Sequence, residues 1–490
     1  MKINSDLKFK YKVVFYCSLI VVFEGEYVSM YINMPICIEK CIERIEKSGF
    51  QAYIVGGCVR DSIRGEKPND WDICTSATPE EIKEIFKSEK TIDVGIEHGT
   101  VVVLLENESI EITTFRIDGD YSDGRRPDRV EFTPELIEDL SRRDFTINAI
   151  AYNHKVGIVD YFNGAKDIEN KIIKCVGNPE KRFKEDALRI MRALRFMSQL
   201  DYNIAEETLI ALNNNKELLK RISIERISVE LNKLILSDYP SDGIENIFNM
   251  NIMFIVVPFL KKYKCEYIYD YFNVKKCIGV IEKSPKKLHV RLTVFLYYLL
   301  YEHKNESIDS IKRNSKGDVS ILKPHYDIKL KIKCEDILKK LHYDNNTIKK
   351  VSTLITYYDT PIYKDKLYIK RLLQNIGVEA LHELVIIKDA TRMFLEKESL
   401  EIEQQFNVNR SDIEQVLEEI LESREVYHKS GLEVTGKDLI NLGIKEGILI
   451  GKILDELLEI VIKEPKNNEK EKLTLYAQQM YNNLKSNKNM

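Results

Sequence analysis

The chain has 490 residues, of which 44% are hydrophobic and 31% are charged, and its net charge at pH 7 is −4. This length suffices for roughly two to four domains, and the composition is that of a globular protein rather than a disordered or fibrous one. The charge balance excludes a chain that is basic throughout, so contact with nucleic acid would need local clusters of Lys and Arg.

The N-terminus carries an apolar run from Val13 to Phe23 after a basic start. The run is too short to cross a bilayer, and no small-residue cleavage site follows it. We therefore expect no membrane span and interpret residues 1–34 as an N-terminal extension. The nine cysteines form no C-x-x-C pair, which indicates reduced thiols in the cytosol.

Helix and strand signals alternate from residue 35 to about residue 155. Pro35 to Ser48 predicts an amphipathic helix, and "AYIV" and "WDICTS" predict strands on either side of a turn at two glycines. "TPEE", which starts at Thr78, predicts a helix start with a capping box. "TVVVLLE" and "SIEITTFR" predict a β-hairpin.

Beyond residue 180 the strand signals fade, and "EDALRIMRALRFMSQL" and "ISIERISVELNKLIL" have apolar residues at helical spacing. The predicted fold class is α+β, with a small α/β head followed by a long all-α region. We place the head at residues 35–178, a helical neck at 179–240, a helical body at 241–430 and a helical tail at 431–490.

The triplet Asp70-Trp71-Asp72 lies just behind the glycine turn. Alternation along a strand would put both carboxylates on one face and Trp71 in the core. Neighbouring carboxylates repel each other unless a cation lies between them, and Mg²⁺ would offset the repulsion while binding phosphate oxygens. Arg60 could reach those phosphates, and Glu111 on the next strand is a candidate third carboxylate.

Seven stretches of the sequence occur in the same order as matching motifs of a known protein family. They are "GGCVRD", "NDWDICTSATPEEI", "IDVGIEHGTVVV", "EITTFRIDGDYSDGRRP", "RRDFTINAIAY", "KRFKEDALRIMRALRF" and "ISIERISVEL". In these stretches the chain resembles the class II tRNA nucleotidyltransferases, the CCA-adding enzymes, whose bacterial poly(A) polymerase relatives share the same head. The resemblance covers residues 50–235 almost continuously and returns in the tail from "VTGKDLI" onward.

The resemblance implies roles for individual residues. Asp70 and Asp72 would carry Mg²⁺, with Glu111 as the third catalytic candidate. Residues that would contact the nucleotide are Gly57, Arg60, Arg143, Asp186, Arg189, Arg192 and Arg195. Asp144 and Asn148 are candidates for contact with the ribose, and Arg143 for contact with the triphosphate.

Asp186 and Arg189 would read the base. They are three residues apart, which predicts neighbours on one helix face. A carboxylate only accepts hydrogen bonds and a guanidinium only donates them, so the pair complements the amino group and ring nitrogen of cytosine or adenine. Uracil and guanine present the reverse pattern, and unpaired buried polar groups can give discrimination of roughly four to five powers of ten.

Two further stretches bear on the activity. Residues 118–132, "DGDYSDGRRPDRVEF", resemble the family's loop linked to the switch from adding C to adding A. In the body, "VRLTVFLYYLLYEH" has Tyr-Tyr where some longer relatives carry the His-Asp pair of a phosphohydrolase. We therefore expect complete CCA addition and no hydrolase site.

The expected function is that of a cytoplasmic, Mg²⁺-dependent CCA-adding enzyme that extends the 3′ end of tRNA with CTP and ATP. A bacterial poly(A) polymerase and an enzyme that adds only the two cytidines are the nearest alternatives. An RNA-binding protein with an inactive nucleotide site is an alternative from another class. The sequence leaves the oligomeric state open.

Overall fold

The structure, a computed structural model, divides the chain into two units, Met1–Pro258 and Phe259–Met490. It describes residues 20–23, 26–29, 31–93, 95–106, 108–119, 129–258, 260, 271–300, 327–402, 404–444 and 447–486. The finer division at residues 178, 240 and 430 stays a prediction.

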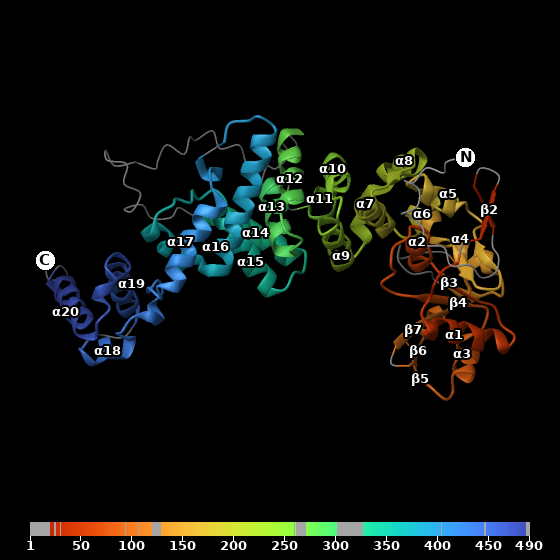
Figure 1. The fold of residues 1–490 in the computed structure, drawn as a ribbon, viewed down its shortest axis with the longest axis horizontal. Coiled ribbons are helices and arrows are strands. Elements are labelled where there is room, and N and C mark those ends of the chain that lie inside the picture. The colour runs from red at the N-terminus through yellow and green to blue at the C-terminus, as the bar shows by residue number, and fades with distance from the viewer. Residues whose placement is uncertain are drawn as a thin grey trace, which may run out of the picture. The chain divides into compact units, whose positions relative to one another are not determined.

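The first unit contains a seven-stranded sheet with the strand order β11-β10-β3-β4-β7-β6-β5 (Figure 1). The strands are β3 (Ala52–Val55), β4 (Asp72–Thr75), β5 (Lys90–Asp93), β6 (Thr100–Leu105), β7 (Glu108–Thr114), β10 (Ala151–Asn153) and β11 (Gly157–Val159). β6 and β7 form the predicted hairpin. The pairing of β4 with β7 is parallel, whereas the other neighbours in this sheet pair antiparallel.

Two helices pack on this sheet, α1 (Ile36–Lys47) against β3 and α3 (Pro79–Ile85) against β6 and β7. α1 buries Ile38, Ile42 and Ile45, which confirms the predicted amphipathic helix. At the start of α3, Thr78 and Glu81 form the predicted capping box. Local sequence signals therefore place these two helices correctly.

The remaining helices of the first unit follow or flank the strands. They are α2 (Gly57–Ile63), α4 (Leu136–Ser141), α5 (Gly164–Glu169), α6 (Pro179–Glu185), α7 (Leu188–Leu200), α8 (Glu206–Asn215), α9 (Ile224–Ile235), α10 (Ser241–Asn249) and α11 (Ile252–Val256). α7 packs against both α9 and α10, as Figure 1 shows. The chain leaves the helical conformation at Asp186, so the single predicted helix is two helices, α6 and α7.

Among the described residues, three short strand pairs lie outside the main sheet. β1 (Ile20–Phe23) pairs with β2 (Glu26–Ser29) in the stretch expected to be an extension. β8 (Arg116–Asp118) pairs with β9 (Val130–Phe132), and β12 (Ile172–Ile173) pairs with β13 (Asn203–Ile204). Of the loop predicted at residues 118–132, residues 120–128 lie outside the described part of the chain.

All the regular secondary structure among the described residues of the second unit is helical, which confirms the α+β class with a helical C-terminal region. Its helices are α12 (Tyr271–Lys283), α13 (Leu288–Leu300), α14 (Ile328–Lys340), α15 (Asn345–Thr356), α16 (Lys366–Lys397), α17 (Arg410–Glu422), α18 (Gly436–Asn441), α19 (Ile448–Lys463) and α20 (Lys470–Ser486). α16 is kinked at Gly377, whose φ is 77°. Among the described residues, no helix is long and apolar enough to cross a membrane.

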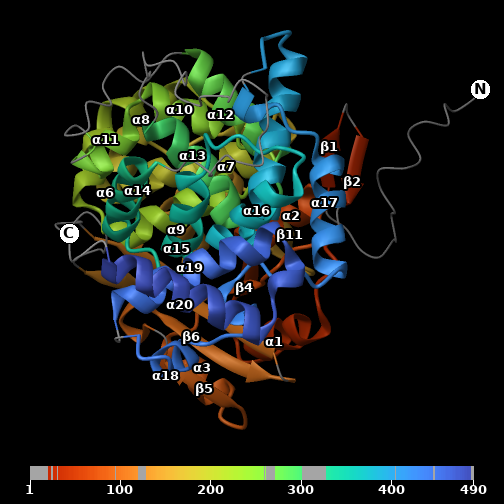
Figure 2. The ribbon, with the colours of Figure 1, turned by 90° about the vertical axis from the view of Figure 1, so that its left-hand side faces the viewer.

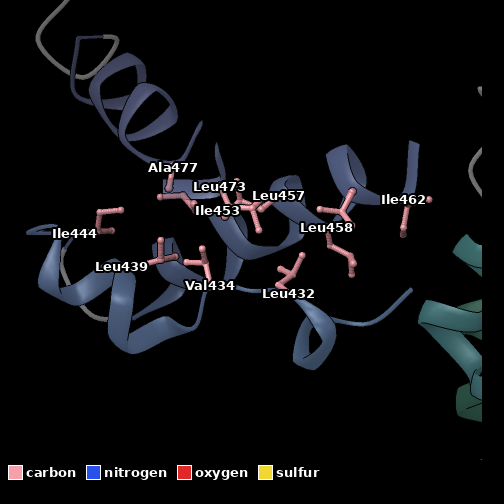
Figure 3. Packing of buried hydrophobic residues seen from close by; sticks show 11 residues of the cluster. Leu432, Val434, Leu439, Ile444, Ile453, Leu457, Leu458, Ile462, Leu473 and Ala477 are labelled. Atoms are coloured by element: carbon pink, nitrogen blue, oxygen red, sulfur yellow. The ribbon is translucent and has the colours of Figure 1, made fainter. Parts of the chain in front are cut away.

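The last three helices have a hydrophobic core of their own. α19 packs against α20, and α18 contacts both of them, as can be followed in Figure 2. Leu439 of α18, Leu457 of α19 and Leu473 of α20 are fully buried in this cluster (Figure 3). Burial of leucine side chains stabilises a fold by about 1.5–3 kcal/mol each relative to exposure, so this core holds the three helices together.

Candidate functional site

The structure gathers the three carboxylates predicted from the sequence. Asp72 begins β4 and lies in parallel register with Glu111 of β7. Asp70 lies two residues before Asp72, and all three side chains have solvent-accessible surface. Trp71 is only partly buried, so the expectation that it points into the core is wrong. The reason is that β4 starts at Asp72, so strand alternation does not extend back to Trp71.

Burial and the two neighbouring carboxylates both act on the pKa of Asp72. Protein atoms packed around the carboxylate desolvate it, and Asp70 and Glu111 repel its negative charge; together they raise its pKa from 3.8 to about 6. Arg143 opposes this shift. A site with this much unbalanced negative charge and only oxygen ligands suits a hard divalent cation such as Mg²⁺.

The glycine turn at the start of α2 brings two guanidinium groups to the site. Gly56 has a φ of 82°, and a Cβ there would lie 3.3 Å from Nη1 of Arg143. A Cβ on Gly57 would lie 3.7 Å from Nη2 of Arg60. The turn therefore needs glycine at position 56, both for its backbone conformation and for the close approach of Arg143.

Arg143 is held by a carboxylate that the sequence reasoning did not single out. Asp139 of α4 is buried and accepts hydrogen bonds from Nη2 of Arg143 at 3.1 Å and Nη2 of Arg142 at 2.7 Å. Burial alone would raise the pKa of Asp139, but the two guanidinium groups outweigh it and lower the pKa. The i,i+3 and i,i+4 spacing of these residues was the available sequence signal.

A chain of hydrogen bonds connects α2 with α7. Arg60 donates from Nη1 to Oδ1 of Asn148 at 2.7 Å, and Asn148 donates from Nδ2 to Oδ1 of Asp144 at 3.1 Å. Nε of Arg192 donates to Oδ2 of Asp144 at 2.7 Å. Although burial opposes ionisation, Arg192 and Asn148 hold the pKa of Asp144 well below its usual range.

The sequence analysis also did not identify Asp61 as a site residue. Its two carboxylate oxygens accept hydrogen bonds from Nε and Nη2 of Arg60 at 2.8 and 2.9 Å.

Three predicted nucleotide-contacting arginines share one aromatic ring. The guanidinium carbons of Arg195, Arg60 and Arg192 lie 4.0, 5.2 and 5.5 Å from the ring centroid of Phe196. These distances fall within the range of cation–π attraction, about 6 Å. Phe196 is buried, so its ring is a fixed surface against which the three cations rest.

The predicted base-reading residues lie close in the chain but in different settings. Asp186 is the non-helical residue between α6 and α7; its Oδ1 accepts from the amide of Leu188 at 3.0 Å and its Oδ2 from Nη2 of Arg226 at 2.8 Å. Arg189, in the first turn of α7, donates to Glu185 at 2.7 Å and to two main-chain carbonyl groups. The prediction of two neighbours on one helix face is therefore wrong, because Asp186 does not belong to the helix.

A second group of potential metal ligands lies in the second unit. Nε2 of His289 is 2.8 and 2.9 Å from the two carboxylate oxygens of Glu383, and Glu379 lies close to both residues. Lys287 pairs with Glu383 at 3.1 Å and Lys350 with Glu379 at 2.6 Å. Each carboxylate thus already has a cationic partner, and ion pairing accounts for the cluster.

The Tyr297-Tyr298 pair stands where a His-Asp pair was considered. Both rings are buried, and the hydroxyl of Tyr297 donates to Oδ1 of Asp359 at 2.6 Å. Tyr297 also stacks on Tyr358 with ring centroids 3.7 Å apart. The two tyrosines therefore have a structural role in this segment.

Family models match three stretches of the chain. The poly(A) polymerase head domain matches residues 52–174, which contain the sheet and its carboxylates. The RNA and SrmB-binding site of polymerase A matches residues 201–264, and tRNA nucleotidyltransferase domain 2 matches residues 324–477. The head fold and its carboxylates thus define a nucleotidyltransferase.

Similar proteins narrow the class. The chain is 35% identical over 432 residues to a CCA-adding enzyme of Limosilactobacillus reuteri, an alignment that covers 87% of this chain and 92% of that protein. It is 44% identical over 295 residues to the CCA-adding enzyme of Ligilactobacillus salivarius, covering 59% of this chain and 70% of the relative. A crystal structure of the Bacillus stearothermophilus CCA-adding enzyme in complex with CTP matches with a TM-score of 0.67 and 28% identity, covering 93% of this chain and 98% of the other. The chain belongs to the CCA-adding enzymes.

Proposed function

We propose that this protein adds C, C and A to the 3′ end of tRNA from CTP and ATP, with Mg²⁺ as its metal and without a nucleic-acid template. The observation that carries the proposal is the meeting of Asp70, Asp72 and Glu111 beside Arg143, inside a head that belongs to this family. The relative of known structure was crystallised with CTP, which supports CTP as one of the donors.

The carboxylate cluster fits the metal. Asp70 and Asp72 would hold Mg²⁺, and Glu111 would complete the oxygen-only ligand set. When bound, the metal would neutralise phosphate charge and favour ionisation of the attacking hydroxyl. The raised pKa of Asp72 supports this assignment, because it reflects burial and repulsion among carboxylates that a bound cation would offset.

The arginines around the cluster would hold the triphosphate. Arg143 lies beside the carboxylates, and Arg60 and Arg192 extend the positive surface toward α7. Their guanidinium groups are already fixed by Asp139, Asp61 and Asp144, so they need little reorganisation when the nucleotide binds. The terminal ribose hydroxyl of the tRNA would then attack the α-phosphate, and pyrophosphate would leave. Positioning and charge stabilisation would supply most of the rate enhancement.

Asp186 and Arg189 would select the base. The carboxylate of Asp186 offers about four lone-pair sites, and the Leu188 amide and Arg226 leave it able to accept from the amino group of cytosine or adenine. Arg189 would donate to the ring nitrogen beside that amino group. Gly57 and Arg195 complete the set of residues proposed to contact the nucleotide.

We propose further that the helical residues 241–430 and 431–490 hold the tRNA, that residues 179–240 connect them to the head, and that the protein works in the cytoplasm. Phosphate contacts would position the tRNA without reading its sequence. Such binding would weaken steeply as salt increases.

The test uses three tRNA transcripts that end before CCA, after C and after CC. Each transcript is incubated with Mg²⁺ and CTP, ATP or both, and products are resolved to single nucleotides. Addition of C, C and A followed by a stop is the expected result. Long A-tails without use of CTP would make the protein a poly(A) polymerase, and a stop after CC would make it a CC-adding enzyme. Retained tRNA binding without any extension would place it among the RNA-binding proteins.

A further inference from the structure

Helix α9 carries Arg226, which pairs with the side chain of Asp186. Arg226 donates from Nη2 to Oδ2 of Asp186 at 2.8 Å and from Nη1 to Oδ1 at 3.4 Å. A guanidinium that faces both oxygens of a carboxylate fixes its plane as well as its position. Two groups thus hold the carboxylate of Asp186: the amide of Leu188 binds Oδ1, and Arg226 supplies the hydrogen bond to Oδ2.

The same helix supports a second residue of the proposed nucleotide site. Oε2 of Glu230 forms an ion pair with Nε of Arg195 at 2.9 Å, and both side chains are buried. Burial and the nearby Arg192 lower the pKa of Arg195 to about 10, and Glu230 opposes that shift. A buried cation that loses its counter-charge is strongly destabilised, so Glu230 stabilises the Arg195 cation in its position against the Phe196 ring.

Arg226 and Glu230, the two supporting residues, lie on one face of α9. Arg226 and Glu230 are four residues apart, one turn along α9, and therefore project from the same face of the helix. That face contacts α7, which carries Arg189 and Arg195. In the proposed nucleotide site, α9 thus pairs the positive Arg226 with Asp186 and the negative Glu230 with Arg195.

We propose that Arg226 and Glu230 are positioning residues that set base selection, an inference that rests on the proposed function. Arg226 orients the Asp186 carboxylate so that its remaining lone pairs meet the amino group of cytosine or adenine. Without Arg226 only the Leu188 amide holds the carboxylate, at Oδ1. Oδ2 then becomes free to move, and the penalty for the carbonyl oxygen of uracil or guanine falls. Glu230 acts on the same site through Arg195, and its loss weakens nucleotide binding for all bases alike.

The experiment measures single-nucleotide addition to a tRNA transcript that ends before CCA, with CTP and, separately, UTP. Four variants of the full-length protein are compared: Arg226→Gln, Arg226→Lys, Glu230→Gln and the control Lys233→Gln, which alters an exposed residue of the same helix. Melting temperature and tRNA affinity are measured alongside, because a change confined to folding would move those two quantities.

We expect Arg226→Gln to lower the ratio of kcat/KM for CTP to that for UTP by about tenfold, the effect of losing one charged hydrogen bond. Arg226→Lys keeps the charge but not the two-pronged contact, and should recover part of the ratio. Glu230→Gln should raise KM for CTP about tenfold and leave the ratio unchanged. The affinity for tRNA should match that of the control in all variants.

An unchanged CTP-to-UTP ratio in folded Arg226→Gln would overturn the role of Arg226. Should that variant not fold, an unchanged ratio in Arg226→Lys would do the same. An unchanged KM in Glu230→Gln would overturn the role of Glu230. Failure of the wild-type protein to add C would instead refute the proposed function itself, so the two failures are distinguishable.

Discussion

Replacing Asp72 with asparagine should make the metal-free protein more stable and inactive at the same time. The pKa of this carboxyl is about 6 in the folded protein and 3.8 ordinarily, so its ionised form is disfavoured by folding. The stabilising contribution of the protonated form is complete below pH 3.8 and is lost as the pH rises to 6. At pH 7.5 the ionised Asp72 therefore lowers the free energy of unfolding of the wild-type protein by its full amount. Asparagine carries no charge and removes this destabilisation.

The magnitude follows from the shift. A change from 3.8 to about 6 is roughly two pKa units, which would correspond to about 3 kcal/mol if the group were fully shielded from water. The Asp72 side chain is solvent-accessible, and screening reduces the expected gain to about 1 kcal/mol. For a unit of this size, that gain corresponds to a rise in melting temperature of about 2–4 °C.

The assay records thermal unfolding of wild type and Asp72→Asn from pH 4 to pH 8 without divalent metal, and again with added Mg²⁺. The difference between the proteins should be largest above pH 7 and vanish near pH 4. Mg²⁺ should stabilise only the wild type, because ligand binding to the folded state raises its stability. Nucleotide addition by the variant should fall at least about a hundredfold.

Glu108→Gln serves as the control, since Glu108 is an exposed carboxylate on the same strand as Glu111. It should change neither the melting temperature nor the response to Mg²⁺. A lower melting temperature for Asp72→Asn than for wild type at pH 7.5 would refute the reasoning, because it would show that the charged carboxylate stabilises the fold.

Three other substitutions test the remaining parts of the site and fold. Glu111→Gln removes one of the charges that raise the pKa of Asp72, so the acid limb of the pH–rate profile should move to lower pH while more Mg²⁺ is needed for half-maximal activity. Arg143→Lys keeps a positive charge but loses the planar fork, and KM for CTP should rise about tenfold in steady-state kinetics with tRNA affinity unchanged. Gly164→Ala would place a Cβ 2.1 Å from the carbonyl oxygen of Thr146, and urea denaturation should show a loss of about 1–3 kcal/mol. Gly451→Ala, where nothing lies within 4 Å of the added Cβ, should show no such loss.

Local patterns were sufficient for much of the head. The capping box at Thr78 and the hairpin of β6 and β7 were predictable because each depends on residues close in the chain. The position of Glu111 on a strand next to the Asp pair was also anticipated, and the register with Asp72 confirms it. Strands β5, β10 and β11, which are three or four residues long, were not predicted.

Tertiary contacts explain what sequence reasoning missed. The stretch around Asp186 has good helical propensity, yet Asp186 is non-helical, accepts from the amide of Leu188 and pairs with Arg226, which is 40 residues away. No local pattern reveals that partner. The same holds for Glu230, whose contact with Arg195 depends on the packing of α9 against α7. The proposed roles of the site residues remain predictions that kinetics can test.

The contacts of three arginines with the ring of Phe196 affect how the sequence of this site can evolve. Arg60, Arg192 and Arg195 all rest on one side chain, so a substitution at any one of them alters the surroundings of the other two. Effects of mutations that share a partner are generally not additive. Drift at these four positions should therefore be strongly epistatic, with tolerated changes arriving in combination, whereas an exposed residue such as Lys233 of α9 can vary on its own.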